Sequence, residues 1–216
     1  MDAVLLDLYE TLVRTRWGKL SERLTAELGI PKADLFRAYE ATIIARGVGT
    51  FGSREGDMTA IVEAAGIDPD LDLIGRLLDM EREYTETGVE FWEDSLPVVR
   101  ELRSRGVKAA VISNCSHSTR PIVDRLKLAE EFDEILLSFE VGIMKPDPRI
   151  YQEALHRLGD VSPGLAVFVD DQPAYCDGAV ALGIETFLID RSGDGTPDLN
   201  GHRVIRDLQA LLAVGA

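Results

Sequence analysis

Four short apolar segments of the chain each run directly into polar residues. The first is Ala3-Val4-Leu5-Leu6, which is followed by Asp7 and then by Leu8-Tyr9-Glu10-Thr11. An apolar run of this length predicts a buried strand, and polar residues at its carboxyl end lie where open α/β sheets bind ligands. The other three segments are Val111-Ile112-Ser113-Asn114, Gly142-Ile143-Met144-Lys145-Pro146 and Val167-Phe168-Val169-Asp170-Asp171.

Residues 14 to about 88 follow a helical period and contain no strand pattern. Trp17, Leu20, Leu24 and Leu28 recur at three- and four-residue spacings, and Gly29 is a typical helix stop. Similar apolar stripes predict three more helices, at about 33–46, 58–65 and 71–85.

After this region, predicted helices and strands alternate. This alternation implies a parallel sheet that is covered by helices on both faces. The chain is therefore predicted to have an α/β core, residues 1–13 and 89–216, interrupted by an all-helical insertion, residues 14–88. An insertion directly after the first strand is expected to form a lid over the sheet edge. The helices are expected at 96–105, 118–126, 148–158, 178–182 and 204–212, and the strands at 108–113, 134–137, 166–169 and 186–189.

Composition and charge narrow the class of protein. Of the 216 residues, 45% are hydrophobic and 28% are charged, which suits a soluble globular protein with one sizeable core. The net charge of 23 − 38 = −15 opposes binding to nucleic acid or to an anionic membrane, because both need a basic surface. Cys115 and Cys176 form no disulfide framework, and no apolar stretch is long enough to span a membrane. We therefore expect a cytoplasmic protein with reduced thiols.

The residues after the apolar segments have complementary chemistry. Asp7 could act as a nucleophile that attacks a phosphoryl group or an activated carbon and forms an aspartyl ester. Ser113 and Asn114 offer a hydroxyl and successive backbone N–H groups, which could hold an anionic oxygen. Lys145 would supply a fixed positive charge. Taken singly, each of these residues is more often a turn, a cap or a surface residue.

Asp170 and Asp171 give the strongest independent signal. Two adjacent carboxylates at the end of a buried strand are costly unless a cation or a lysine compensates their charge. Oxygen ligands without histidine or cysteine favour Mg²⁺. The pair therefore predicts a Mg²⁺ site, and the anion-holding groups beside it predict a small anionic substrate.

The order and spacing of the four segments resemble those of the haloacid dehalogenase superfamily, whose members are hydrolases with an aspartate nucleophile. The resemblance covers essentially the whole chain. It implies a Rossmann-like core and a helical cap inserted after the first motif. Further residues fall where the family usually has them: Leu12, Gly142, Pro146, Tyr151, Gly178, Ala179 and Gly183.

The resemblance also implies roles for individual residues. Asp7 would be the nucleophile, and Thr11 would order the loop that carries it. Ser113 and Lys145 would hold the transferring group, beside Asn114 and Tyr9 as further substrate contacts.

The metal ligands follow from the same resemblance. Asp171 would bind Mg²⁺ together with Asp7 and the backbone carbonyl of Tyr9. Asp170 would bind the ion through water or pair with Lys145.

The chain departs from the family's phosphatases at Tyr9. Those enzymes carry a second aspartate there, as acid and base for the leaving group, and a small residue where this chain has Glu10. General acid catalysis contributes roughly 10²–10⁴-fold to such reactions. We therefore expect weak hydrolysis of alkyl phosphates and a smaller loss with aryl or acyl phosphates.

Two alternatives to a Mg²⁺-dependent phosphatase remain open. A tyrosine at position 9, together with Tyr151, is typical of 2-haloacid dehalogenases, but those enzymes have uncharged residues in place of Asp170 and Asp171. A binding or regulatory protein on the same scaffold is the second alternative, because fold does not fix function. We rank the phosphatase-type hydrolase first.

Residues in and beside the insertion are candidates for the pocket wall. Aromatic side chains there could line a pocket, although they are more often part of a core. Arginines could reach a substrate carboxylate or phosphate, although a solvated helix face is the commoner place for them. The candidates are Trp17, Phe36, Tyr39, Phe51 and Trp92, and the arginines Arg16, Arg37 and Arg46.

Overall fold

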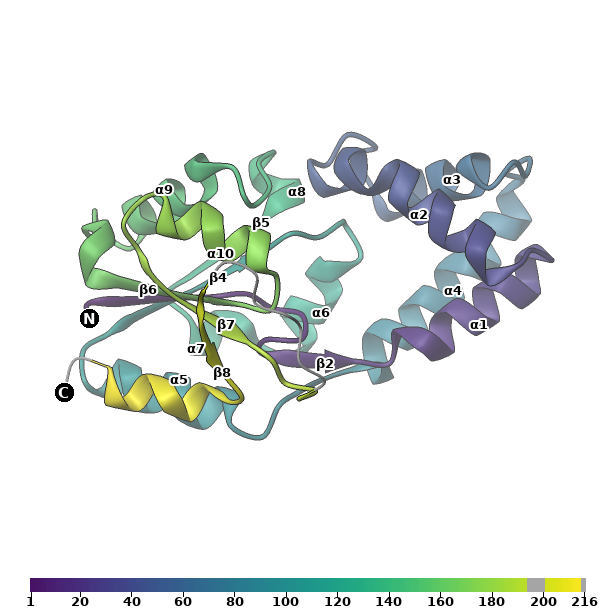
Figure 1. The fold of residues 1–216 in the computed structure, drawn as a ribbon. Coiled ribbons are helices and arrows are strands. Elements are labelled where there is room, and N and C mark those ends of the chain that lie inside the picture. The colour runs from purple at the N-terminus through teal and green to yellow at the C-terminus, as the bar shows by residue number, and fades with distance from the viewer. Residues whose placement is uncertain (194–200, 215–216) are drawn as a thin grey trace.

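A six-stranded parallel sheet forms the centre of the core (Figure 1). The computed structural model describes residues 1–193 and 201–214. The strand order is β5-β4-β1-β6-β7-β8, which confirms the predicted α/β class. The strands are β1 (Ala3–Leu6), β4 (Lys108–Ser113), β5 (Glu134–Leu137), β6 (Ala166–Asp170), β7 (Glu185–Ile189) and β8 (Arg203–Ile205).

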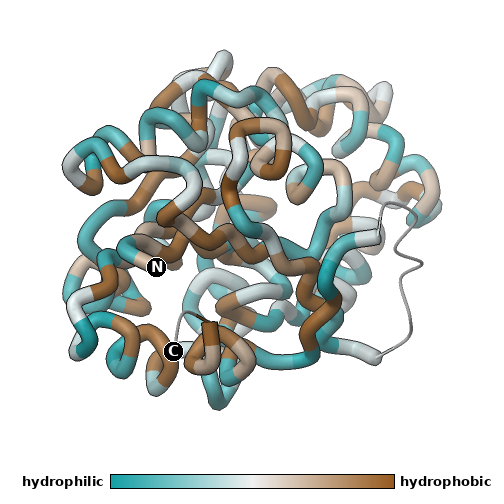
Figure 2. Tube along the Cα trace, turned by 60° about the vertical axis from the view of Figure 1, so that its left-hand side comes forward, coloured by the Kyte–Doolittle hydropathy of each residue, from teal (hydrophilic) through white to brown (hydrophobic). Residues whose placement is uncertain are grey.

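Helices cover both faces of the sheet, so the central strands are buried on both sides. Val4 and Leu6 of β1 face one hydrophobic cluster, and Ala3 and Leu5 face the other. Figure 2 shows the hydrophobic residues gathered along the strands in the middle of the molecule. The first cluster includes α5 (Ser95–Ser104), α6 (Thr119–Arg125), α7 (Leu128–Glu131) and the 3₁₀ helix η2 (Leu208–Ala213); the second includes α9 (Pro148–Arg157) and α10 (Pro173–Val180).

The position of β1 determines where the site forms. Leu6 pairs with Val111 of β4 on one side and with Val169 of β6 on the other. After β1, the next two strands along the chain, β4 and β5, lie on one side of it, and β6, β7 and β8 lie on the other side. β1 is therefore next to a topological switch point, where open α/β sheets leave a crevice for ligands. The residues that follow β1, β4 and β6 therefore meet at one edge.

Four helices lie beyond that edge (Figure 1). They pack around a hydrophobic cluster of their own, which contains Leu24, Leu35, Met58 and Leu77. The prediction of a helical cap is confirmed. None of the helices in the described part of the chain has the length and apolar character needed to cross a membrane. The four are α1 (Trp17–Leu28), α2 (Lys32–Gly47), α3 (Arg54–Ala64) and α4 (Leu71–Thr87).

A two-stranded antiparallel sheet joins these helices to the core. β2 (Val13–Thr15) leads out of the core, and β3 (Val89–Phe91) leads back, with Val13 paired to Phe91. The expectation of no strand between residues 14 and 88 was wrong for Arg14 and Thr15. A three-residue strand is too short to show alternation, and its partner is more than seventy positions away in the sequence.

Two predictions near the C-terminus were also wrong in detail. Residues 204–212 were expected to form one helix, but β8 precedes η2 there. The apolar spacing of Ile205, Leu208 and Leu211 fits a helix, yet Asp207 accepts a hydrogen bond from the Gln209 N–H and starts η2 after the strand. The helix expected at 178–182 begins at Pro173, a residue favoured at the first helical position. The short elements α7, α8 (Ser138–Val141) and η1 (Pro163–Leu165) were not predicted.

Candidate active site

A buried lysine joins two carboxylates at the edge of the sheet. Nζ of Lys145 donates hydrogen bonds to Asp7 and to Asp170, both at 2.6 Å. A third bond, at 2.8 Å, goes to the carbonyl of Ile112 in β4. The exposed fractions of Asp7, Lys145 and Asp170 are 6%, 2% and 0%. The lysine therefore ties the ends of β1, β4 and β6 together with charge-assisted hydrogen bonds.

Asn114 fixes the backbone that carries this lysine. Its side-chain Oδ1 accepts from the Lys145 N–H at 2.8 Å, and its Nδ2 donates to the Lys145 carbonyl at 2.8 Å. Both polar atoms of the amide are thus engaged with a segment 31 positions away. In this structure Asn114 positions Lys145 while it also lines the cavity described below.

The loop after β6 presents the second acid beside the first. The Gln172 N–H donates to Asp170 Oδ1 at 2.8 Å, and the Gln172 side chain donates to Asp171 Oδ2 at 2.7 Å. Asp7, Asp170 and Asp171 each offer one oxygen, and these oxygens all lie within 4.8 Å of one another. Three converging carboxylate oxygens are a donor set for a hard divalent cation.

The electrostatics of this group favour a further positive charge. Burial raises the pKa of Asp7 to about 8, since Lys145 offsets only part of the desolvation cost and Asp170 adds repulsion. Burial and then Asp170 raise the pKa of Asp171 to about 6. Burial alone would lower the pKa of Lys145, but Asp170 and Asp7 raise it above its usual value. When all three carboxyl groups are ionised, they and the one ammonium leave an excess of two negative charges, which a divalent cation would neutralise.

Ser113 and Thr11, two further predicted site residues, are both buried. Ser113 ends β4, and its side chain is fully buried. Thr11 is also fully buried, and no described residue is a hydrogen-bond partner of its hydroxyl. Its carbonyl accepts from the Arg191 guanidinium at 2.7 Å, and Arg191 pairs with Asp94 at 2.7 Å. Arg191, which follows β7, thus fixes the loop after β1.

A cavity of about 430 Å³ lies between the sheet edge and the four helices. Asp7, Tyr9, Asn114 and Asp171 line its core side. The other predicted site residues do not line the cavity; they are Thr11, Ser113, Lys145 and Asp170. The helical side contributes Trp17, Leu20, Tyr39, Ile43, Arg46, Gly47, Asp57, Met58, Ile61, Glu81, Tyr84 and Thr85.

Tyr9 and Glu10 occupy the positions where the chain differs from the phosphatases of the superfamily that it resembles. The Tyr9 hydroxyl is 2.8 Å from the Thr119 hydroxyl, so the ring is held against α6. Glu10 has a φ of 57°, a left-handed conformation that favours glycine. Its carboxylate accepts from the Thr15 N–H at 3.2 Å and from the Thr15 hydroxyl at 2.8 Å. This pairing turns the Glu10 carboxylate toward β2.

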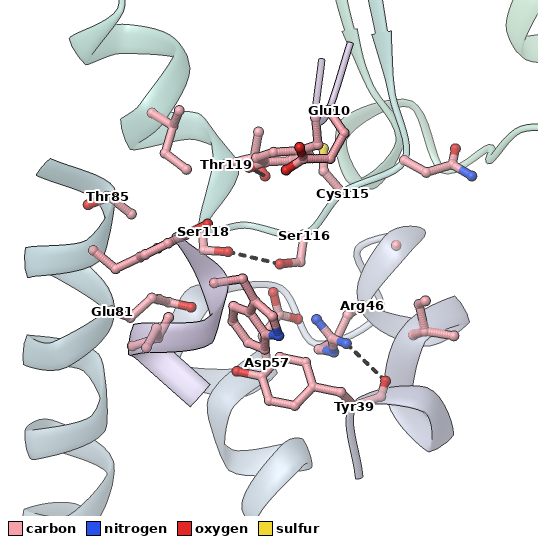
Figure 3. Close-up of a pocket in the computed structure, with 18 of the residues that line it drawn as sticks. Glu10, Tyr39, Arg46, Asp57, Glu81, Thr85, Cys115, Ser116, Ser118 and Thr119 are labelled. Carbon is pink, nitrogen blue, oxygen red and sulfur yellow. Dashed lines mark hydrogen bonds between the residues drawn. The ribbon is translucent and has the colours of Figure 1, made fainter. Parts of the chain in front are cut away.

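Two cap residues at the cavity could not be singled out from the sequence: Asp57 was not predicted, and Arg46 was one of three candidate arginines. Asp57 of α3 accepts from the His117 N–H at 3.1 Å and lies 2.9 Å from its Nδ1, which links the cap to the loop after β4. Arg46 of α2 is buried in the cavity wall (Figure 3). Partners 60 positions apart leave no local pattern, and one arginine on a helix looks like any other.

Comparison with known proteins identifies the family. The sequence profile described as "Hydrolase: haloacid dehalogenase-like hydrolase" matches residues 1–183. The chain therefore belongs to the haloacid dehalogenase-like hydrolases, as the four motifs predicted.

Its relatives include proteins named as phosphatases and proteins named as haloacid dehalogenases. The chain is 30% identical to "Phosphatase MT3486" of Mycobacterium tuberculosis over 99% of this chain and 96% of that protein. It is 33% identical to "(S)-2-haloacid dehalogenase 1" of Pseudomonas sp. over 60% of this chain and 55% of that protein. The crystal structure of a phosphatase of this family from Thermococcus onnurineus superimposes with a TM-score of 0.70 at 24% identity, covering 98% and 96% of the two chains. That likeness shows the shared fold.

The buried lysine gives a stability prediction. The substitution Lys145→Met would leave Asp7 and Asp170 facing each other without a counter-charge. Breaking a buried ion pair in this way costs about 3–5 kcal/mol. We expect urea unfolding to show a loss of that size in the free energy of unfolding.

Lys127→Met is the matched control, because Lys127 pairs with Glu130 at 3.4 Å on the surface. An exposed pair contributes about 0–1 kcal/mol. Equal losses in the two variants would contradict the assignment of Lys145 as the electrostatic centre.

Proposed function

We propose that this chain is a Mg²⁺-dependent phosphatase-type hydrolase that acts on a small phosphorylated metabolite. The proposal rests on one observation: the oxygens of Asp7, Asp170 and Asp171 converge to within 4.8 Å while Lys145 neutralises only part of their charge. A dehalogenase, which needs no metal, would gain nothing from three crowded carboxylates that repel a haloacid anion.

The residues of the chain would carry the reaction through two displacements. In the first, a carboxylate oxygen of Asp7 bonds to phosphorus while the bond to the leaving oxygen breaks. In the second, a water oxygen attacks the same phosphorus, and Asp7 and inorganic phosphate are released. The proton that the water loses balances the proton that the leaving oxygen takes up. Lys145 keeps its hydrogen bond to Asp7 and holds that side chain in place.

The site fits Mg²⁺, because its donors are all oxygens and its charge excess is negative. Asp7, Asp171 and the backbone carbonyl of Tyr9 would hold the ion, while Asp170 pairs with Lys145. A bound Mg²⁺ would supply positive charge beside the phosphoryl oxygens. Ser113 would contribute to the anion cradle, and Thr11 would order the nucleophile loop. The four helices, as a cap, would exclude water from the cavity.

A 2-haloacid dehalogenase is the second candidate. Tyr9 replaces the leaving-group acid, which a departing halide does not need, and a relative named as a (S)-2-haloacid dehalogenase shares 33% identity over part of the chain. In both reactions Asp7 would be the nucleophile.

One assay separates these functions. The purified protein is given 4-nitrophenyl phosphate or L-2-chloropropionate, each with Mg²⁺ and with EDTA. We expect phosphate release that needs Mg²⁺, and we expect Asp7→Asn to reduce it by at least about 10³-fold, because the nucleophile is lost. Asp2→Asn, an exposed aspartate before the same strand, is the control and should keep its activity.

The other outcomes of this assay assign the alternatives. Halide release in the presence of EDTA would establish the dehalogenase. No turnover of either compound would favour a binding or regulatory protein. Full activity in Asp7→Asn would end the nucleophile assignment for any hydrolase.

Tyr9 generates a second prediction. Tyr9→Asp would place a carboxyl group where the family's phosphatases have their acid and base, and general acid catalysis contributes roughly 10²–10⁴-fold. We expect kcat/KM for an alkyl phosphate such as ethyl phosphate to rise by about 10²-fold, with a smaller change for 4-nitrophenyl phosphate.

Tyr9→Phe is the control, because it removes the hydrogen bond to Thr119 without adding an acid. A similar rise in both variants, or none in Tyr9→Asp, would show that position 9 does not face the leaving group.

A further inference from the structure

Arg46 is a buried cation without a close counter-ion. It is 9% exposed, and no acidic group lies within 4 Å of it in the described part of the chain. Burial lowers its pKa from the usual value. Buried charges in proteins are ordinarily paired, because an unpaired one has lost its hydration without compensation. Arg46 therefore offers a positive charge to an anionic ligand in the cavity that it lines.

Neither neighbouring acid forms an ion pair with Arg46 within the described residues. Asp57 uses Oδ2 for the N–H and Nδ1 of His117, and its buried Oδ1 has no hydrogen-bond partner among the described residues. Glu81 pairs with Arg54 at 3.0 Å. In Figure 3 the Arg46 guanidinium lies near Asp57 and Tyr39, on the helical side of the cavity.

The guanidinium is held in one orientation. Its Nε donates to the Thr42 hydroxyl at 2.9 Å, and Nη2 donates to the Tyr39 carbonyl at 3.0 Å. The guanidinium carbon lies 4.9 Å from the centroid of the Tyr39 ring. An arginine has five N–H donors, and these two bonds leave three of them free, including both on Nη1. The free edge has the geometry that binds a carboxylate through two parallel hydrogen bonds.

The other two candidate arginines of the cap lack these properties. Arg16 pairs with Glu90 at 3.1 Å, and Arg37 pairs with Asp34, both on the exposed surface. Arg46 is the one of the three that lines the cavity.

The cavity limits what the ligand can be. Its volume of about 430 Å³ is at the low end for ligand pockets, roughly 300–1,000 Å³, so the ligand is small. Five acidic residues line it, against Arg46 alone: Asp7, Glu10, Asp57, Glu81 and Asp171. A singly charged carboxylate is repelled less by these acids than a second phosphate would be.

We infer that Arg46 binds a carboxylate of the substrate, so that the substrate is a small phosphorylated carboxylic acid whose phosphoryl group lies at Asp7. This inference rests on the proposed function, because the phosphoryl site is the one assigned there. Arg46 binds the far end of the substrate from α2, and Asp7 and Asp171 face its reacting end from the core.

The test compares two phosphonates that differ only in the group at the far end. Phosphonoacetate carries a carboxylate, and ethylphosphonate has a methyl group in its place. Inhibition constants are measured against 4-nitrophenyl phosphate hydrolysis with Mg²⁺, and dissociation constants are measured by titration calorimetry. We expect phosphonoacetate to bind the wild-type protein roughly 10- to 100-fold more tightly, as a charge-assisted hydrogen-bonded pair implies.

The variants assign that preference to a residue. Arg46→Met should abolish it, and Arg46→Lys should keep only part of it, because lysine has the charge but not the planar fork. Arg37→Met, on the same helix but exposed and paired with Asp34, should keep the whole preference. Circular dichroism reports whether each variant is folded, and the wild-type comparison stands even if Arg46→Met is not.

Each contrary result has a distinct meaning. Equal binding of the two phosphonates by the wild-type protein would overturn the inference, and so would an unchanged preference in Arg46→Met. Tighter, Arg46-dependent binding of methylenebisphosphonate would overturn the carboxylate assignment in favour of a second phosphate. If 4-nitrophenyl phosphate is not hydrolysed, the proposed function fails, while calorimetry still decides whether Arg46 binds the carboxylate.

Discussion

The ion pairs of Lys145 with Asp7 and Asp170 are the constraint on which the candidate site depends. Carboxylates from two adjacent strands could not stay buried side by side without a cation between them. Lys145 lies in a loop that follows neither β1 nor β6. Asn114, directly after β4, forms two hydrogen bonds with the Lys145 backbone. The residual negative charge then favours a divalent cation beside Asp171.

The fold places these groups through the position of β1. Because β1 lies between β4 and β6, the loops after all three strands meet at the switch point of the sheet. The chain also leaves the core directly after β1 and returns through β3, so the antiparallel pair β2–β3 holds the four helices over the same edge. The cavity therefore has a wall of strand ends on one side and a wall of helices, including Arg46, on the other.

The sequence predicted the parts of the structure that leave a local pattern. Buried strands such as Ala3–Leu6 appear as continuous apolar runs, and the cap helices α1 and α4 show a clear helical period. Pairings across long separations could not be predicted, including β2 with β3, Asp57 with His117, and the grip of Asn114 on Lys145. The burial of Arg46 depends on how α2 packs against α3 and approaches α8, and the local sequence does not show this packing.

The most direct test of this account is titration calorimetry with Mg²⁺. We predict one saturable Mg²⁺ site per wild-type chain and loss of that site in Asp171→Asn, because this carboxylate faces the cavity and has no lysine partner. Asp147→Asn, which changes a partly exposed aspartate paired with Arg149, should bind the ion as the wild-type protein does. No saturable binding to the wild-type protein, or equal binding to Asp171→Asn, would contradict the account.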